Sequence, residues 1–347
     1  MNQIVKEDIE NIALCKEIDW MKFSNKRVLV SGASGFLASY LIETLLSLEH
    51  IYGIRVQITA LIRSKERYDT RFGHHVNNPN LTMLLQDVCE PISLNHPHHF
   101  IIHAASQASP KYYGIDPVGT LKANILGTMN LLELARGNPI ESFLYFSSGE
   151  VYGETNIFPI KETDYGLVDP VKIRACYAEN KKMGENMCVA WNSQYQIPTK
   201  IIRPFHTYGP GVSLEDGRVF ADFIKNVIEG EDIVMNSNGE AKRAFCYISD
   251  ATKAFFIVLL RGKESVPYNI GNPDAELSIK DLAGIICKLS PEKKLKIINK
   301  KNSNSKYYLK SLITRNCPDI TRVSNLQWSP QVNVRDGFKR TIESYFL

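Results

Sequence analysis

The chain has 347 residues, 44% of them hydrophobic and 22% charged, which is enough for one large or two modest globular domains. Its formal net charge of +4 is small and scattered, so nothing indicates a nucleic-acid-binding face. The longest apolar run, AFFIVLL at 254–260, is too short to cross a bilayer and is typical of a buried helix. We therefore expect neither a nucleic-acid nor a membrane partner.

The amino-terminal segment and the cysteines indicate where the protein works. The first 24 residues mix acids with apolar positions (Ile4, Ile9, Ile12, Leu14) and lack the uninterrupted apolar run of a signal peptide. We predict that residues 1–25 form an amphipathic helical extension packed on the rest of the protein. Seven cysteines without a CxxC pair indicate free thiols, not a disulfide framework. Both features favour the cytoplasm.

Apolar β-rich runs alternate with helical patterns through the first two-thirds of the chain. The predicted strands are residues 27–31, 56–62, 81–86, 100–104, 143–147 and 200–203. Helices are predicted between them, at 36–48, 116–136 and 175–195 among others. This alternation predicts an α/β fold with a doubly wound, Rossmann-like parallel sheet covered by helices on both faces.

After Arg203 the pattern changes. A turn rich in Pro and Gly (RPFHTYGPG) leads into shorter, mixed elements, with strand-like pieces near Tyr247 and at 268–270. We predict a dinucleotide-binding domain at 26–205 and a smaller mixed α/β substrate subdomain at 206–347, with a segment near 243–262 returning to the first domain. Residues 299–308 are predicted to be an exposed loop.

The segment VLVSGASGFLAS contains the pattern of a dinucleotide-binding loop. Gly32 and Gly35 directly follow a strand and begin a helix, as a tight turn and a close backbone approach to a pyrophosphate require. Ala38 occupies the third position of the glycine pattern, where a small residue lets the helix and the strand pack closely. We predict cofactor contacts from Gly32, Gly35, Phe36 and Leu37.

The acid expected at the end of the second strand, which would bind the adenosine ribose, is absent. Arg63 stands there instead, and an arginine can pair with the 2′-phosphate of NADP. Alternatively, Arg63 faces solvent and NAD is bound through other contacts. We further predict Asp87 and Val88 beside the adenine, and Ala104 and Ala105 beside the cofactor backbone.

Three residues suggest redox chemistry. Tyr177 and Lys181 lie four apart in a segment without Pro (RACYAENKKMGENM), so they share one helix face. The ammonium is expected to lower the pKa of the phenol, which then takes a proton from a substrate hydroxyl. Ser148 ends the apolar run of FLYFSSGEVYG, where its hydroxyl can hold the substrate oxygen. By itself, the Tyr–Lys spacing also arises by chance in many helices.

With the glycine loop, the serine at a strand end and YxxxK in this order, the chain resembles the extended short-chain dehydrogenase/reductase family of nucleotide-sugar enzymes. The resemblance extends from Lys26 to the carboxyl terminus. Within the family, the stretches at 108–128, 176–182, 207–223, 243–250 and 269–273 are most similar to UDP-glucuronate decarboxylases.

The resemblance implies a role for each matching residue. Tyr177 is the acid/base, Lys181 binds the nicotinamide ribose, Ser148 holds the substrate oxygen, and Glu150 matches a glutamate of decarboxylases and 4,6-dehydratases. The implied substrate contacts are Ser109, Tyr113, His206, Arg218 and Arg243. No metal site is implied.

Two positions depart from the family pattern. Gly149 replaces the aspartic acid of dehydratases and the serine usual in decarboxylases. His206 replaces an asparagine, and it either packs under its turn or contacts the ligand.

The implied activity is transient oxidation at C4 by bound NAD, with NADP as the alternative cofactor, and decarboxylation of a UDP-glucuronate-like substrate to a UDP-pentose. The alternatives are a C4 or C5 epimerase, then a 4,6-dehydratase, or, in a different class, a non-catalytic NAD(P)-binding sensor. The resemblance also implies a homodimer through a four-helix interface formed by helices at 118–136 and 175–195. The apolar residues on these helices that remain for such an interface are Leu121, Ile125, Met129, Leu132, Met183 and Met187.

Overall fold

A seven-stranded parallel sheet forms the centre of the molecule in the computed structural model, which describes residues 1–300, 309 and 313–347. Its strand order is β10–β6–β5–β4–β1–β2–β3. The bounds are β1 Lys26–Ser31, β2 Val56–Ile62, β3 Leu81–Leu85, β4 Phe100–His103, β5 Ser142–Phe146, β6 Thr199–Pro204 and β10 Pro267–Ile270. The predicted doubly wound α/β fold is confirmed. The predicted loop at 299–308 lies outside the described residues after Lys300.

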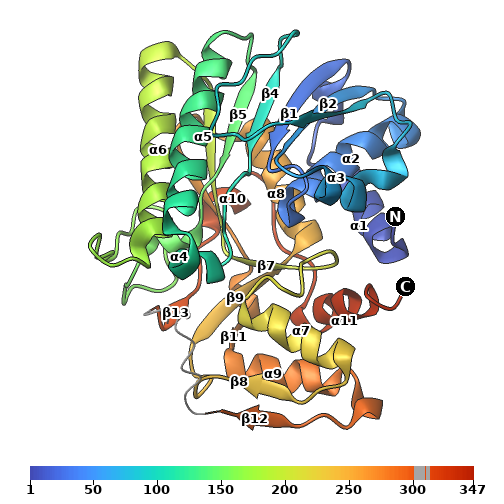
Figure 1. The fold of residues 1–347 in the computed structure, drawn as a ribbon, viewed down its shortest axis with the longest axis vertical. Helices are drawn as coiled ribbons and strands as arrows, with labels where there is room; N and C mark the ends of the chain where they lie inside the picture. Colours follow the sequence, from blue (N-terminus) through green and yellow to red (C-terminus); the bar gives the residue numbers. More distant parts are fainter. Residues whose placement is uncertain (301–308, 310–312) are drawn as a thin grey trace.

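Helices cover both faces of this sheet (Figure 1). One face packs against α2 (Phe36–Tyr52) and α8 (Ile248–Arg261), and the other against α5 (Pro117–Arg136) and α6 (Ala175–Tyr195). Successive side chains of a strand point to opposite faces, so both faces need apolar residues. In β1, Val28 and Val30 join the core under α2 and α8, while Leu29 joins the core under α5 and α6. The run at 254–260 lies in α8, and among the described residues no helix is long and apolar enough to span a bilayer.

The amino-terminal helix α1 (Gln3–Ala13) packs against α2 and α8. The Asn2 side chain caps it, and Ile4, Ile9 and Ile12 are buried. The prediction that Leu14 belongs to the packed face is wrong, because the helix ends at Ala13 and the Leu14 side chain is 62% exposed.

A buried carboxylate ties α1 to the end of the chain. Asp8 accepts hydrogen bonds from the Tyr247 hydroxyl and from Arg340 Nη2, both at 2.8 Å. Arg340 lies on α11 (Val334–Glu343), so the first and last long helices are joined through one carboxylate.

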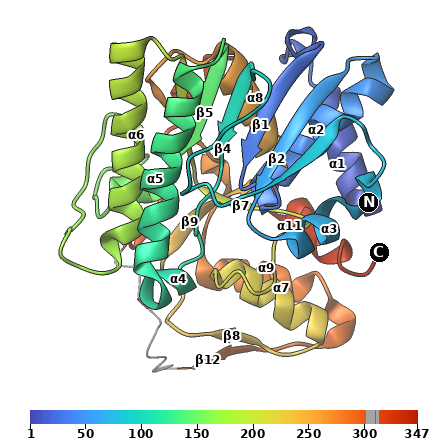
Figure 2. The ribbon, with the colours of Figure 1, turned by 45° about the horizontal axis from the view of Figure 1, so that its top comes forward.

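The carboxyl-terminal third forms a smaller layer facing the carboxyl ends of the parallel strands (Figures 1 and 2). Strand β9 (Lys242–Tyr247) pairs antiparallel with β11 (Glu276–Ser278) and parallel with β7 (His206–Tyr208) and β13 (Arg315–Asn316). The remaining elements of this layer are β8 Ile233–Met235, β12 Ile297–Asn299, α7 Val219–Glu229 and α9 Ile279–Lys288, whereas α10 Thr321–Ser324 packs against β10 of the main sheet.

The chain returns to the main sheet after β9, and the return is longer than the sequence suggested. Beyond α8, strand β10 pairs with β6, with Tyr268 opposite Ile202. The returning segment therefore extends to Ile270, past the predicted end near residue 262.

Gly32 has a left-handed backbone (φ +65°), and a Cβ there would lie 2.7 Å from Ala105 Cα. Gly53, with φ +68°, offers a matched control because a Cβ there would meet nothing within 4 Å. We expect Gly53→Ala to lower the free energy of unfolding by about 1 kcal/mol, from backbone strain alone. Gly32→Ala should lower it by about 3 kcal/mol, because strain and overlap combine. Urea unfolding measures both losses, and equal losses would contradict a close contact at Gly32.

Candidate active site

A cleft of about 1880 Å³ lies between the carboxyl ends of the parallel strands and the carboxyl-terminal layer. Most of the residues predicted from the sequence line it: Gly32, Gly35, Phe36, Leu37, Arg63, Ala104, Ser109, Tyr113, Ser148, Glu150, Tyr177, Lys181, His206, Arg218 and Arg243. The fold therefore gathers residues from both predicted domains around one space.

Three predicted cofactor residues, Asp87, Val88 and Ala105, make contacts within the protein. The Val88 side chain is buried against α5, where the missing side chain of Gly127 leaves it room. Asp87 accepts a hydrogen bond from the Cys89 backbone N–H at 2.9 Å. Ala105 packs against Gly32 and donates its backbone N–H to Ser31 Oγ at 3.3 Å. None of the three is among the residues that line the cleft.

The glycine loop fits a dinucleotide pyrophosphate. Gly35 donates its N–H to the Gly32 carbonyl at 2.8 Å, which closes the turn and begins α2 at Phe36. No side chain of the described residues caps α2, so the first backbone N–H groups of this helix stay available to an anion. A helix amino terminus of this kind attracts phosphate through its unpaired N–H groups and its dipole.

The adenosine side of the cleft carries more positive charge than the sequence suggested. Arg63 follows β2 and lines the cleft, as predicted, and Arg67 of α3 (Lys65–Phe72) lines it as well. Arg67 was not predicted, because its position one turn into a short polar helix gives no signal of its own.

Ser148, Tyr177 and Lys181 come together at the end of β5. Helix α6 carries both Tyr177 and Lys181, and the Lys181 Nζ lies 5.8 Å from the centre of the Tyr177 ring. Lys181 donates to the Phe146 carbonyl at 2.6 Å, which fixes the amine against the strand. The Ser148 hydroxyl accepts the Glu150 backbone N–H at 3.1 Å, and its interaction with the phenol of Tyr177 lowers the pKa of that phenol.

The predicted lowering of the Tyr177 pKa is wrong for the protein without ligand. Burial is the main cause that raises this pKa to about 12; the hydrogen-bonding Ser148 acts against it and the charge of Glu150 acts with it. Burial also lowers the pKa of Lys181 to about 7. The amine therefore loses much of the charge that was expected to favour the phenolate.

An arginine that the sequence did not predict holds Glu150, the residue that the resemblance matches to a glutamate of decarboxylases. Arg174 Nη1 donates to Glu150 Oε2 at 3.1 Å, and both side chains are about three-quarters buried. The guanidinium also lies 5.8 Å from the centre of the Tyr113 ring. Tyr113 in turn stacks on Tyr177, with ring centres 5.0 Å apart and planes at 16°. The only signal in the sequence was the position of Arg174, three residues before Tyr177.

A loop between β7 and α7 forms the opposite wall. Arg218 pairs with both carboxylate oxygens of Asp216, with Nη2 donating to Oδ2 at 2.9 Å. The hydroxyl of Ser109 donates to the Asp216 carbonyl, which links the loop after β4 to this wall. Asp216 was also missed, because its role depends on this contact across the cleft.

Two basic side chains complete this wall. Arg243 on β9 donates to the carbonyls of Lys242 and Ile313, both at 2.8 Å, and faces the cleft. Burial holds the pKa of His206 well below its usual range, and the charges of Arg243 and Arg218 lower it further, so the ring is neutral. His206 Nδ1 is buried without a hydrogen-bond partner in the described part of the chain.

A buried ion pair between Glu185 and Arg203 fixes helix α6 to strand β6. Glu185, one turn after Lys181, accepts from Arg203 Nη2 at 2.6 Å and from the Ser147 hydroxyl. Arg203 also donates to the Tyr152 hydroxyl at 2.8 Å. Since α6 and β6 are fixed together by these bonds, Tyr177 and Lys181 are held by a rigid scaffold.

Residues 28–271 match the NAD dependent epimerase/dehydratase family. The chain belongs to this family. It is 33% identical to UDP-glucuronic acid decarboxylase 5 of Arabidopsis thaliana, over 93% of this chain and 90% of that protein. The resemblance inferred from the sequence is thus confirmed.

Solved structures show the same fold. An epimerase from Methanothermobacter thermautotrophicus superimposes with a TM-score of 0.82 at 21% identity, covering 95% of each chain. A UDP-glucuronic acid 4-epimerase from Bacillus cereus, in complex with UDP-glucuronic acid and NAD, gives a TM-score of 0.76 at 23% identity, covering 92% of this chain and 98% of that one.

The burial of Lys181 makes the free energy of unfolding depend on pH. Its pKa is about 7 in the folded chain against an ordinary value of 10.5. Below pH 7 the amine is charged in both the folded and the unfolded chain, and the full cost of burying the charge applies. As the pH rises from about 7 to about 10.5, the folded chain binds fewer protons than the unfolded chain and this cost fades.

We expect Lys181→Met to raise the free energy of unfolding of the ligand-free protein by about 2 kcal/mol near pH 7, and by less near pH 9.5. Urea unfolding at both pH values measures the difference. Lys182→Met, on the exposed side of the same helix, is the control and should change little. A loss of stability in the Lys181 variant near pH 7 would contradict a costly burial.

Proposed function

We propose that this protein decarboxylates a UDP-glucuronate-like nucleotide sugar to a UDP-pentose. The observation that carries the proposal is the assembly of Ser148, Tyr177 and Lys181 beside Glu150 in one cleft with a dinucleotide loop. The decarboxylase relatives favour this reaction over others of the same family.

Dehydration is disfavoured by the surroundings of Gly149. A Cβ at this position would lie 3.2 Å from the ring of Phe205, so the aromatic ring fills the space that a side chain at 149 would enter. The position therefore has neither the acid that dehydration needs nor room for one without movement of the ring.

In the proposed reaction, Tyr177 removes the proton of the C4 hydroxyl while Ser148 holds the oxygen. Bound NAD⁺ supplies the hydride acceptor for C4 and the hydride that later reduces it. A positive charge on a bound nicotinamide near the phenol would lower the Tyr177 pKa from its ligand-free value.

The resulting 4-ketone lies β to the C6 carboxylate. The C5–C6 bond breaks, its electrons pass to the ketone as an enolate, and carbon dioxide leaves. A proton from water then adds to C5, so that UDP-glucuronate and one proton give a UDP-pentose and carbon dioxide. Glu150, held by Arg174, orients the sugar and this water.

Incubation with UDP-glucuronate in D₂O tests the proposal. We expect carbon dioxide and a UDP-pentose that carries one deuterium at C5, without net change in the nucleotide cofactor. Tyr177→Phe should reduce the rate at least about 10³-fold, because it removes the acid/base group. Tyr165→Phe, at a 78% exposed tyrosine, is the control.

Other products identify the alternatives. A product that keeps its carboxylate and gains no deuterium indicates a C4 epimerase, and one that keeps its carboxylate and exchanges at C5 indicates a C5 epimerase. A cofactor-bound protein that converts no nucleotide sugar would instead support a sensor.

We propose NAD as the resident cofactor. The family description and the NAD-bound relative support it. Arg63 and Arg67 on the adenosine side support NADP as the alternative, since each can pair with a 2′-phosphate. Denaturation of the purified protein releases its bound nucleotide, and the mass of that nucleotide distinguishes NAD from NADP.

We also propose that the protein works in the cytoplasm. All seven cysteines are free in the structure, and three of them (Cys188, Cys246, Cys317) are buried. Free thiols at so many positions suit a reducing compartment.

We propose a homodimer through α5 and α6. These helices lie side by side at one edge of the molecule in Figures 1 and 2, and their outer faces carry exposed apolar side chains: Leu126, Met129, Met183 and Val189. Leu132 and Met187, which the sequence analysis counted among the residues that remain for such an interface, are instead buried in the core under these helices.

We expect the wild-type protein to have twice the mass of the chain in light scattering after size-exclusion chromatography. Leu126→Glu combined with Met183→Glu should halve this mass, because the two charges would be desolvated in a paired interface. Val171→Glu, at an 89% exposed loop residue, is the control. A monomeric wild-type protein would contradict the proposal.

A further inference from the structure

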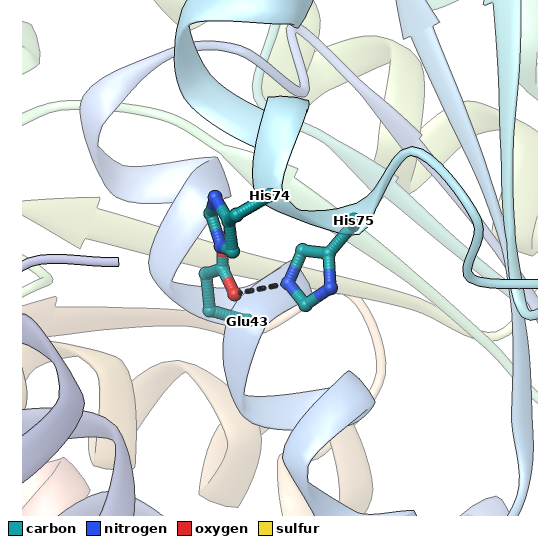
Figure 3. A group of neighbouring side chains, drawn as sticks. All are labelled: Glu43, His74 and His75. Atoms are coloured by element: carbon teal, nitrogen blue, oxygen red, sulfur yellow. Dashed lines mark hydrogen bonds and ion pairs between the residues drawn. The ribbon is translucent and has the colours of Figure 1, made fainter.

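Three side chains outside the catalytic centre converge on one point (Figure 3). Glu43 Oε1 lies 3.1 Å from His74 Nε2, and Glu43 Oε2 lies 2.7 Å from His75 Nε2. The potential ligand atoms of the three residues all lie within 4.8 Å of one another. Each imidazole thus presents the same nitrogen to a different oxygen of one carboxylate.

The cluster is partly buried and is not an ion pair on the surface. The Glu43 side chain is only 5% exposed, whereas those of His75 and His74 are 17% and 31% exposed. Glu43 comes from the middle of α2, and the two histidines come from a short 3₁₀ helix, Gly73–His75, that directly follows α3. Two separate segments therefore hold the three groups in place.

The donor set and its spacing suit a first-row transition metal. Two imidazole nitrogens and one carboxylate oxygen form a ligand set that Zn²⁺ takes in proteins, at bonds of about 2.0–2.1 Å. Tetrahedral bonds of that length place neighbouring ligand atoms about 3.3 Å apart. The observed contacts of 2.7 and 3.1 Å need to open by only a few tenths of an ångström to admit an ion.

The cluster is open to the large cleft and has a positive charge nearby. Glu43 and His74 line the far end of the large cleft, so an ion there can keep a coordination position open to water or a small anion. Arg71 carries a positive charge that interacts with Glu43, and its Nη2 donates to the Gly211 carbonyl at 2.9 Å. This guanidinium weakens cation binding, so we expect a moderate affinity and not that of a structural zinc finger.

We propose that Glu43, His74 and His75 form a binding site for a divalent transition metal of the Zn²⁺ class. The ion joins α2, the helix that begins at the dinucleotide loop, to the segment that follows α3. It therefore braces the adenosine end of the cleft. The sequence does not reveal this site, because Glu43 lies 32 residues from His75 and no metal-binding spacing connects them.

Titration of the full-length, metal-free protein with Zn²⁺ tests the site. We expect one saturable Zn²⁺ per chain by isothermal titration calorimetry, and a rise in the unfolding temperature with Zn²⁺ concentration. Bound Co²⁺ should give the visible absorption of a tetrahedral N/O site without a thiolate-to-metal charge-transfer band. That band separates this site from adventitious binding by the seven cysteines.

Glu43→Gln and His75→Asn should each weaken Zn²⁺ binding at least about tenfold and abolish the rise in unfolding temperature. His50→Asn, at an exposed histidine near the end of the same helix, is the matched control and should bind as the wild type does. Circular dichroism of each variant without metal confirms that it is folded. Absence of saturable binding, or binding that survives both substitutions, would overturn the proposal.

Discussion

The structure depends on a close contact between two neighbouring strand ends. The chain runs from β1 to β2 and β3 on one side of the sheet and then crosses to β4 on the other side. This reversal leaves a crevice at the carboxyl ends of β1 and β4, where ligands of doubly wound folds bind. Gly32 and Ala105 meet across it, with no space for a Cβ on the glycine. Every other part of the cofactor site is placed relative to this contact.

The two proposed catalytic residues on α6, Tyr177 and Lys181, are buried, and burial shifts the pKa of each. Lys181 is 2% exposed and Tyr177 is 6% exposed, and their pKa values shift in opposite directions as a result, toward the neutral form of each. The Glu185–Arg203 pair beneath them is satisfied by several hydrogen bonds, so it anchors the helix without leaving a buried charge unpaired. These bonds hold α6, and with it Tyr177 and Lys181, in place against β6.

The carboxyl-terminal layer, which we propose binds the substrate, is tied to the sheet at several points. Ser109 reaches the loop at Asp216, and strand β10 returns to the edge of the sheet. Asp8 joins the first helix to Tyr247 and Arg340. Arg218, His206 and Arg243 thus line the same cleft as Tyr177.

The sequence by itself determined the sheet, the glycine loop and the residues that we propose carry the chemistry. These features depend on short-range physics: strand and helix periodicity, the backbone freedom of Gly32, and the four-residue spacing of Tyr177 and Lys181 on one helix face. Such signals are present in the order of residues alone.

Only the tertiary structure decided the electrostatics and the long-range partners. The sign of the Tyr177 pKa shift depends on burial, which spacing does not reveal, and Val88 turned inward because Gly127 lies opposite it. Arg174, Asp216 and the Glu43–His74–His75 cluster act through contacts that folding creates. Charges that interact over a few ångströms can lie far apart in sequence, so their partners are known only once the chain is folded.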